Sequence, residues 1–333
     1  MAATIKDIAK KTGLGLATIS TYINGGNVRP QNKQAIDDAI EELGYKVNEL
    51  ARGLKTNKTK TIGVIIPEIT AHFYISVISV LEEVFRSNGY AAIITDCHSN
   101  EELEKQAVEF LVRKRVDGIV NIPVTVDGSH LKSAFDEGIP VVFVDRILPG
   151  VDCDCVLVDN VDAVKKATEL LIANKHKHIG GIFGPNEVFT TQERLLGYKL
   201  ALLENGIMES EAIIVHGEYT TKSGIECMEK MITEHPEVTA VVVTSYEIMM
   251  GAVIALNQHG LKIPEDISFI GFDNPDFART VTPELYVVTQ PISSIAEHTA
   301  NIMLERLNGN SGASRVVRLS TMLEKGNSIL KKE

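Results

Sequence analysis

The stretch TIKDIAKKTGLGLATISTYIN, residues 4–24, predicts two short helices joined by a tight turn. Its opening threonine is followed three positions later by Asp7, a pairing typical of a helix start. Gly13 is a residue that commonly ends a helix. A second helix is expected from about Gly15, with Ile19 on its apolar side.

A third helix is expected from Pro30, which is favourable in a first turn, to Gly44, which stops it. Three short helices with about four residues between the first two form a helix-turn-helix. In that motif the second helix enters the major groove of DNA. Residues 1–60 are therefore a candidate DNA-binding head.

The distribution of charge agrees with a head of this kind. The 333 residues carry a formal net charge of −11, yet residues 1–60 hold ten basic and six acidic side chains. The rest of the chain therefore carries −15. We expect only the head to contact a polyanion, while the acidic body is repelled from it.

The opening stretch, together with AIEELGYKVNELARGLK at residues 39–55, resembles the lactose-repressor/galactose-repressor (LacI/GalR) family of bacterial transcription regulators. The resemblance implies a helix-turn-helix head at 1–46 and a hinge helix with a linker at 47–60. It assigns base contacts to Leu16, Ala17 and Thr21, phosphate contacts to Thr4, Thr18 and Asn24, and the minor-groove wedge with its basic neighbour to Leu54 and Lys55.

Three positions of the head depart from the family pattern. Gly15 stands where a serine cap is usual, and glycine caps a helix more weakly. Thr21 stands where many relatives have arginine, so it lacks the bidentate contact that arginine makes to guanine. Val47 replaces the proline that usually begins the hinge helix. The operator preference of relatives therefore does not transfer to this chain.

From residue 61 the sequence alternates short β-branched runs, such as TIGVIIP and SFIGFD, with amphipathic stretches such as VISVLEEVFRSNG. This alternation predicts parallel sheets with crossover helices, and the number of units predicts two α/β lobes. The body resembles a periplasmic sugar-binding protein. The expected core spans 61–333, with one lobe at about 61–160 and 291–320 and the other at about 161–290 and 321–333.

Polar and aromatic residues follow the predicted strands, where ligands bind in parallel sheets. Aromatic faces with carboxylates, guanidiniums and amides suit a polyhydroxylated small molecule. The resemblance makes these residues an effector pocket. The expected pocket residues are Phe73, Tyr74, Asp145, Arg146, Thr190, Arg194, Tyr219, Ser245, Tyr246, Asp273 and Gln290. Tyr246 departs from the aspartate usual in the family, which leaves the effector unidentified.

No cofactor and no metal are expected. Cys153 and Cys155 are too closely spaced for a zinc or redox motif. His176 and His178 lack a third ligand and are expected at the surface. No segment resembles a secretory signal or a membrane span, so a cytoplasmic location without membrane contact is expected.

These features predict a DNA-binding transcription regulator, a repressor of carbohydrate-metabolism genes controlled by a sugar-like effector. The expected partners are double-stranded DNA with a palindromic operator, the effector, and a second copy of the chain. One alternative is control by a protein corepressor, as in the family's carbon-catabolite branch. Others are a sugar-binding protein or an enzyme, although no nucleophile is paired with a base.

Overall fold

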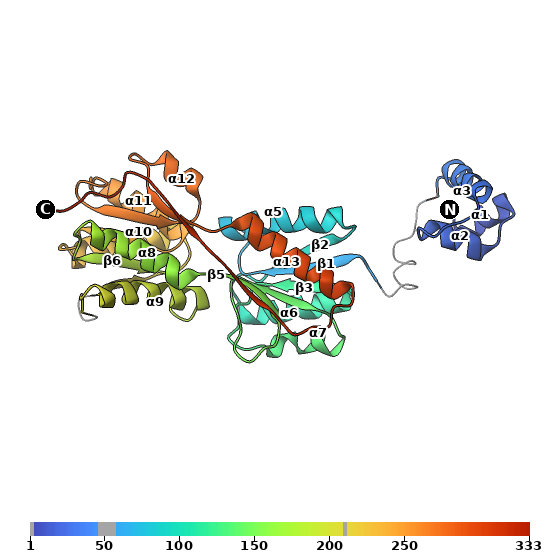
Figure 1. The fold of residues 1–333 in the computed structure, drawn as a ribbon, viewed down its shortest axis with the longest axis horizontal. Helices are drawn as coiled ribbons and strands as arrows, with labels where there is room; N and C mark the ends of the chain where they lie inside the picture. The colour runs from blue at the N-terminus through green and yellow to red at the C-terminus, as the bar shows by residue number, and fades with distance from the viewer. Residues whose placement is uncertain (1–2, 46–57, 209–211) are drawn as a thin grey trace. The chain divides into compact units, whose positions relative to one another are not determined.

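The computed structural model describes residues 3–45, 58–208 and 212–333. The chain divides into two compact units, Met1–Lys60 and Thr61–Glu333. The first is the head and the second is the core, which itself holds two lobes (Figure 1).

The head is a three-helix unit of α1 (Ile5–Thr12), α2 (Leu16–Ile23) and α3 (Pro30–Leu43). The backbone N–H and hydroxyl of Thr4 both donate to the Asp7 carboxylate, at 2.8 and 2.7 Å. Gly13 and Gly44 end α1 and α3 in the left-handed conformation, with φ of 69° and 57°. The predicted helix boundaries of the head are confirmed.

One small apolar core holds the head together. Ile8, Ile19, Ile36 and Ala39 are buried at its centre, one or two from each helix. The Tyr22 hydroxyl donates to Asp37 at 2.5 Å, which fixes α2 against α3. One side of α2 therefore packs in the core of the head, and the opposite side remains accessible to a ligand.

The first lobe of the core is a parallel sheet covered on both faces. Its strand order is β11-β5-β4-β3-β1-β2. Successive residues of the strands alternate between a core under α5 and α13 and a core under α6 and α7. Figure 1 shows these helix pairs on opposite sides of the sheet. The elements are β1 (Thr61–Ile66), α5 (His72–Ser87), β2 (Ala91–Asp96), α6 (Glu101–Arg113), β3 (Gly118–Asn121), η1 (Ser129–Leu131), α7 (Lys132–Asp136), β4 (Val141–Val144), β5 (Asp154–Val158), α13 (Ile292–Leu307) and β11 (Val316–Leu319).

The second lobe repeats this plan, with strand order β12-β10-β9-β8-β6-β7 and only β12 antiparallel to its neighbour. Helices α10 and α11 cover one face, and α8 and α9 cover the other. The elements are α8 (Asn160–Ala173), β6 (Ile179–Phe183), α9 (Phe189–Glu204), β7 (Ile213–His216), α10 (Thr221–Glu234), β8 (Ala240–Val243), α11 (Tyr246–Gln258), β9 (Ser268–Phe272), α12 (Pro275–Thr280), β10 (Tyr286–Thr289) and β12 (Met322–Glu324).

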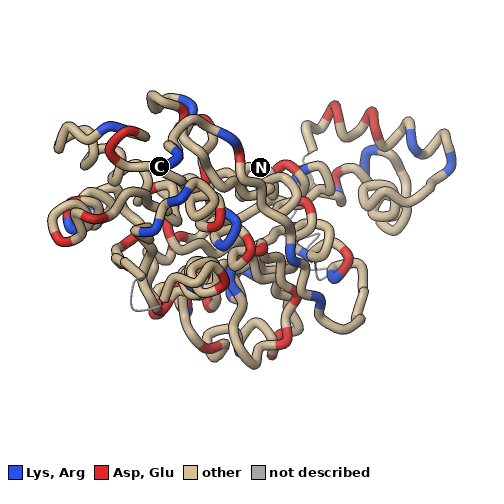
Figure 2. Tube along the Cα trace, turned by 60° about the vertical axis from the view of Figure 1, so that its left-hand side comes forward, with Lys and Arg blue, Asp and Glu red and all other residues tan. Residues whose placement is uncertain are grey.

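The chain crosses between the lobes three times, after β5, after β10 and between β11 and β12. Each sheet is therefore completed by chain from distant parts of the sequence. The carboxyl ends of the parallel strands carry the loops between the lobes, where ligands bind in sheets of this kind. Asp and Glu positions are spread over the core rather than gathered in one segment (Figure 2).

The prediction that His176 lies at the surface is wrong. Its exposed fraction is 1%. Its Nδ1 lies 2.8 Å from the Thr239 hydroxyl, and its Nε2 lies 2.9 Å from the Leu330 carbonyl oxygen. Burial lowers the pKa of this imidazole. His176 therefore fastens the C-terminal segment to the second lobe, a long-range contact that local sequence does not reveal.

Candidate functional site

The exposed side of α2 is the candidate DNA-reading surface of the head. Leu16, Ala17 and Thr21 are all exposed, and Leu16 exposes 47% of its surface. The Thr21 hydroxyl donates to the Ala17 carbonyl oxygen at 2.9 Å, so its lone pairs remain to accept a hydrogen bond. Two apolar side chains and one acceptor suit a thymine methyl group and a single base donor.

The residues expected to contact phosphate take part in hydrogen bonds within the head. Thr4 is paired with Asp7, and the resulting hydrogen bonds lower the pKa of that carboxyl. The Asn24 amide donates to the Ser20 carbonyl oxygen at 2.6 Å. Thr18 is half-buried. Contacts of these residues with phosphate remain predictions. Leu54, Lys55 and Val47 lie outside the described residues.

A cavity of about 510 Å³ lies between the two lobes of the core. Its lining comes from loops at the carboxyl ends of strands in both sheets. Ten of the eleven predicted effector residues line it: Phe73, Tyr74, Asp145, Arg146, Thr190, Arg194, Tyr219, Ser245, Asp273 and Gln290. The structure therefore brings together side chains that are more than 200 positions apart.

Asp145 and Asp273 occupy equivalent places in the two lobes. Each follows the third strand of its sheet order, and each has a positive φ, 67° and 62°. Each backbone N–H donates to the neighbouring strand, Asp145 to Val156 and Asp273 to Val288. A left-handed aspartate is uncommon and is characteristic of functional turns. The two-lobed plan thus supplies one buried carboxylate from each side of the cavity.

Burial governs the ionisation of both carboxyl groups. It raises the pKa of Asp145, although Arg146 and Arg194 oppose the shift. It raises the pKa of Asp273 to about 7, again against Arg194 and a hydrogen bond from Gln290. A carboxyl that titrates near neutrality in a cleft is a candidate for a functional role.

Two buried arginines complete the polar lining. Arg146 donates to the Pro123 carbonyl oxygen at 3.0 Å and to the Tyr74 hydroxyl at 2.9 Å. Arg194 donates to Asn160 Oδ1 at 2.8 Å and to the Thr244 carbonyl oxygen at 2.6 Å. Its guanidinium also stacks on the Phe272 ring at 4.0 Å. These bonds hold both cations in fixed orientations beside the cavity.

Arg194 lies on the second turn of α9, which begins at Phe189, and its side chain is 5% exposed.

A buried carboxylate positions one loop of the cavity. Glu104 of α6 is fully buried and accepts hydrogen bonds from the backbone N–H groups of Val124 at 3.1 Å and Thr125 at 2.8 Å. It also accepts from the Asn121 amide at 3.0 Å and lies 3.3 Å from His130 Nε2. Burial alone would raise the pKa of Glu104, but these hydrogen bonds outweigh it and lower the pKa. The loop so held carries Val124, which lines the cavity.

Comparison with known proteins decides the family. Residues 4–48 match the family described as bacterial regulatory proteins, lacI family. Residues 59–323 match periplasmic binding proteins and the sugar-binding domain of the LacI family. The chain belongs to the LacI family. It is a DNA-binding transcription regulator, and the predicted fold, a helix-turn-helix head followed by a two-lobed α/β core, is confirmed.

Similar LacI-family proteins match over nearly the whole chain. Catabolite control protein A of Priestia megaterium is 32% identical over 326 residues, 97% of this chain and 98% of that protein. The transcriptional repressor CytR of Escherichia coli K12 is 32% identical over 316 residues, 92% and 91% of the two chains. The structure of the regulator CelR in complex with cellobiose has a TM-score of 0.74 at 27% identity and covers 98% of this chain and 99% of its own.

Tyr246, the eleventh predicted effector residue of this LacI-family chain, does not line the cavity. Its ring packs 5.4 Å from that of His72 in the first lobe and 5.6 Å from that of Phe277 in the second. An aromatic ring gains more by packing between two others than by facing solvent. Beside it, Glu247 Oε1 accepts a hydrogen bond from the His72 backbone N–H at 3.2 Å. Tyr246 and Glu247 together connect the second lobe to the N-terminus of α5.

Sequence reasoning missed five acidic residues of the lining. They share one feature, which is that each lies shortly after a strand of a parallel sheet. The rule that ligands bind at the carboxyl ends of such strands would have pointed to them. They are Glu68, Glu101, Glu187, Glu218 and Glu247.

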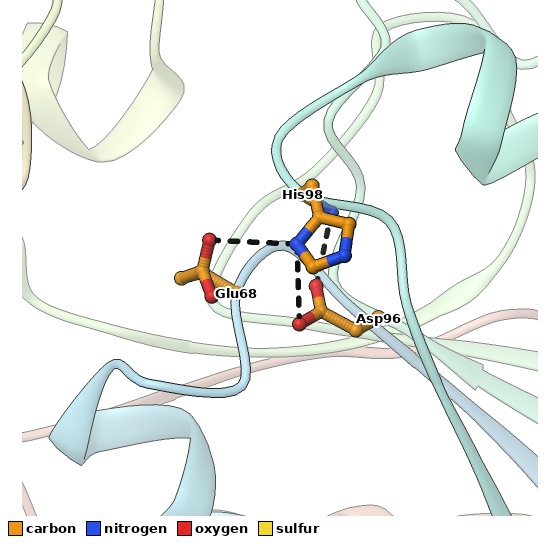
Figure 3. Close-up of side chains that lie close together, drawn as sticks. All are labelled: Glu68, Asp96 and His98. Carbon is orange, nitrogen blue, oxygen red and sulfur yellow. Dashed lines mark hydrogen bonds and ion pairs between the residues drawn. The ribbon is translucent and has the colours of Figure 1, made fainter.

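Among the described residues, one group of side chains could together hold a metal ion, namely Glu68, Asp96 and His98 (Figure 3). His98 Nδ1 lies 3.8 Å from Glu68 Oε2 and 3.5 Å from Asp96 Oδ2. Both Asp96 oxygens already accept from backbone N–H groups, those of Ile69 and His98. No helix of the described chain could span a membrane.

Proposed function

We propose that the protein is a homodimeric repressor whose affinity for a palindromic operator is controlled by a sugar-like effector bound between the lobes. The observation that carries the proposal is that one chain joins a helix with an exposed reading side to a core with a polar, partly aromatic cleft. Effector binding changes the lobe angle and thereby the spacing of the two hinge segments. Residues of the cleft bind the effector and catalyse no reaction.

Three observations support control by a sugar. The cavity of about 510 Å³ is within the range of small-molecule sites. Its carboxylates, amide and guanidiniums can hydrogen-bond hydroxyl groups, and its Phe73 ring can stack on the apolar face of a sugar ring. The related regulator CelR was solved with cellobiose. We therefore expect a carbohydrate to occupy this cleft.

The edge of the first lobe supports a dimer. β2 is an edge strand, and Ile94 on it exposes 41% of its surface. Ile75 of α5 and Phe110 of α6, the helices that pack beside β2, are exposed by 47% and 37%. Exposed apolar side chains along an unpaired strand favour association. Light scattering on the purified chain should give twice the monomer mass.

The function is tested by selecting operator sequences from genomic DNA with the purified full-length protein. We expect Leu16→Ala to weaken binding to the selected operator by about 5- to 100-fold and to relax preference at one base pair, because the side chain contacts a base edge. The affinity of the Leu16→Ala variant for random DNA should not change. Gln34→Ala, an exposed change on α3, is the control. Absence of any enriched sequence, with and without metabolites, would refute DNA-controlled regulation.

Tyr246 offers a test of the lobe connection. We expect Tyr246→Ala to raise the effector dissociation constant by about 3- to 10-fold, because one ring contact between the lobes contributes about 0.5–1.5 kcal/mol. The matched change on the other lobe is His72→Ala. Calorimetry on both variants and the double variant measures the coupling between the rings. Additive losses would show that this pair does not connect the lobes energetically.

Control by a protein corepressor is the second candidate, favoured by the 32% identity to catabolite control protein A. The measurement that separates the two is a pull-down with phosphocarrier protein and operator DNA. Capture that increases operator affinity in the absence of sugar would favour the corepressor.

A further inference from the structure

The lining of the cleft is strongly unbalanced in charge. Among the described residues, seven acidic residues and two arginines line the cavity, with no lysine or histidine. Two of the acids, Asp145 and Asp273, are buried, and two more, Glu68 and Glu247, are half-buried. Because buried charges are screened less than exposed ones, these four groups contribute strongly to the local potential in their ionised forms.

The two arginines offset only part of this excess, and protein groups already hold both of them. Two of the three guanidinium nitrogens of Arg146 already donate to protein oxygens, and the third, Nε, lies 3.7 Å from the Asp145 carboxylate. Arg194 also donates through two of its three nitrogens. A phosphate at either arginine would lie beside Asp145 or Asp273, whose like charge opposes it.

The buried groups instead favour a ligand that donates hydrogen bonds. Both oxygens of Asp273 accept from a single group, the Gln290 amide nitrogen, at 3.0 and 3.1 Å. Gln290 Oε1 is buried and has no hydrogen-bond partner. Arg146 Nε is the one fully buried donor atom of the described lining without a hydrogen-bond partner, and it lies beside the Asp145 carboxylate. Hydroxyl groups can donate to these carboxylates in charge-assisted bonds.

We propose that the cleft selects a saccharide that carries no phosphate or carboxylate group, with a net charge of zero or above. This inference rests on the proposed function, in which a sugar-like ligand occupies the cleft. Its hydroxyl groups donate to Asp145 and Asp273, one carboxylate from each lobe, so a single neutral ligand is held by both lobes. An anionic group in the same place loses its hydration and meets a lining in which acidic side chains outnumber the two arginines.

The experiment compares matched pairs of ligands on the full-length protein by thermal shift and calorimetry. The pairs are glucose, ribose and glucosamine with their terminal phosphates, and cellobiose, gluconate and inorganic phosphate are added singly. Each is measured in EDTA and in Mg²⁺, so that a cation at the Glu68, Asp96 and His98 group is also tested. We expect at least one uncharged or cationic sugar to bind, and its phosphate to bind at least about 100-fold more weakly.

A variant tests the cause of the selectivity. The ratio compared is the dissociation constant of the phosphorylated sugar divided by that of its parent sugar. Asp145→Asn should reduce this ratio by about tenfold or more, because it removes one buried negative charge. Asp152→Asn, an exposed change in the same lobe outside the cavity, should leave the ratio unchanged. A phosphorylated sugar that binds as tightly as its parent in either buffer overturns the inference. The absence of binding by every sugar also overturns the inference. The proposed function is decided separately, by whether the same preparation binds operator DNA.

Discussion

Asp273→Ala is expected to abolish the response to the effector while leaving operator binding by the ligand-free protein intact. The buried carboxylate follows β9 and reaches the cavity with acceptor capacity that Gln290 alone does not fill. Charge-assisted hydrogen bonds to ligand hydroxyls contribute about 1.5–3 kcal/mol each, so one or two of them correspond to a loss of roughly 10- to 20,000-fold. Effector titrations of operator-bound protein measure this loss.

The matched control is Asp276→Asn, three residues further on. Its carboxylate is exposed and pairs only with Arg279 at the surface. Because exposed pairs contribute little, the dose response of this variant should match that of the wild type. If Asp273→Ala also showed the wild-type dose response, Asp273 would not belong to the effector site.

The raised pKa of Asp273 adds a dependence on pH. The folded protein holds this proton up to a pKa of about 7, whereas the unfolded chain releases it near 3.8. The contribution of Asp273 to the free energy of unfolding therefore decreases as pH rises from about 4 to 7. Asp273→Asn should be more stable than the wild type at pH 8, by up to about 4 kcal/mol, and the difference should vanish near pH 4.

Effector binding needs the ionised form of Asp273. The affinity for the effector should therefore fall below pH 7.

Glu104→Ala is expected to lower the free energy of unfolding of the core by about 3–5 kcal/mol, because it leaves several buried partners without an acceptor. The partners are the backbone N–H groups of Val124 and Thr125, the Asn121 amide and the His130 ring. Glu104→Gln should give a smaller loss, since one amide oxygen still accepts. Urea unfolding measures both.

The control for Glu104 is Glu102→Ala, an exposed change on the same helix. We expect it to alter stability by less than about 0.5 kcal/mol. Because the pKa of Glu104 is lowered on folding, its contribution is present above the ordinary glutamate pKa of 4.5 and is lost as pH falls below it. A loss for Glu104→Ala no larger than that of the control would show that the network does not stabilise the loop.

The helices of the head could be predicted from sequence because their signals are local. Gly13, Pro30 and Gly44 act within one turn of the positions where the helices begin or end. Ile8, Ile19 and Ile36 fall on the buried sides that their spacing predicts. Interactions over three or four positions leave a readable pattern in the chain.

Most of the cleft could also be anticipated, since polar residues after buried strands meet at one edge of a parallel sheet. Ten predicted residues line one cavity for this reason. The acidic residues in the same loops went unnoticed because a glutamate after a strand is equally common at a solvated surface. Their excess over the arginines becomes visible only once loops from both lobes are assembled.

The sequence by itself determined the three-helix head, the alternation of strands and helices, and the side chains available to the cleft. Tertiary packing decided where Tyr246 and His176 lie and that Glu104 is enclosed with His130. The physical reason is range. Caps and periodicity act between near neighbours, whereas burial and pKa depend on partners that can be 175 positions away, as in the contact of His72 with Glu247.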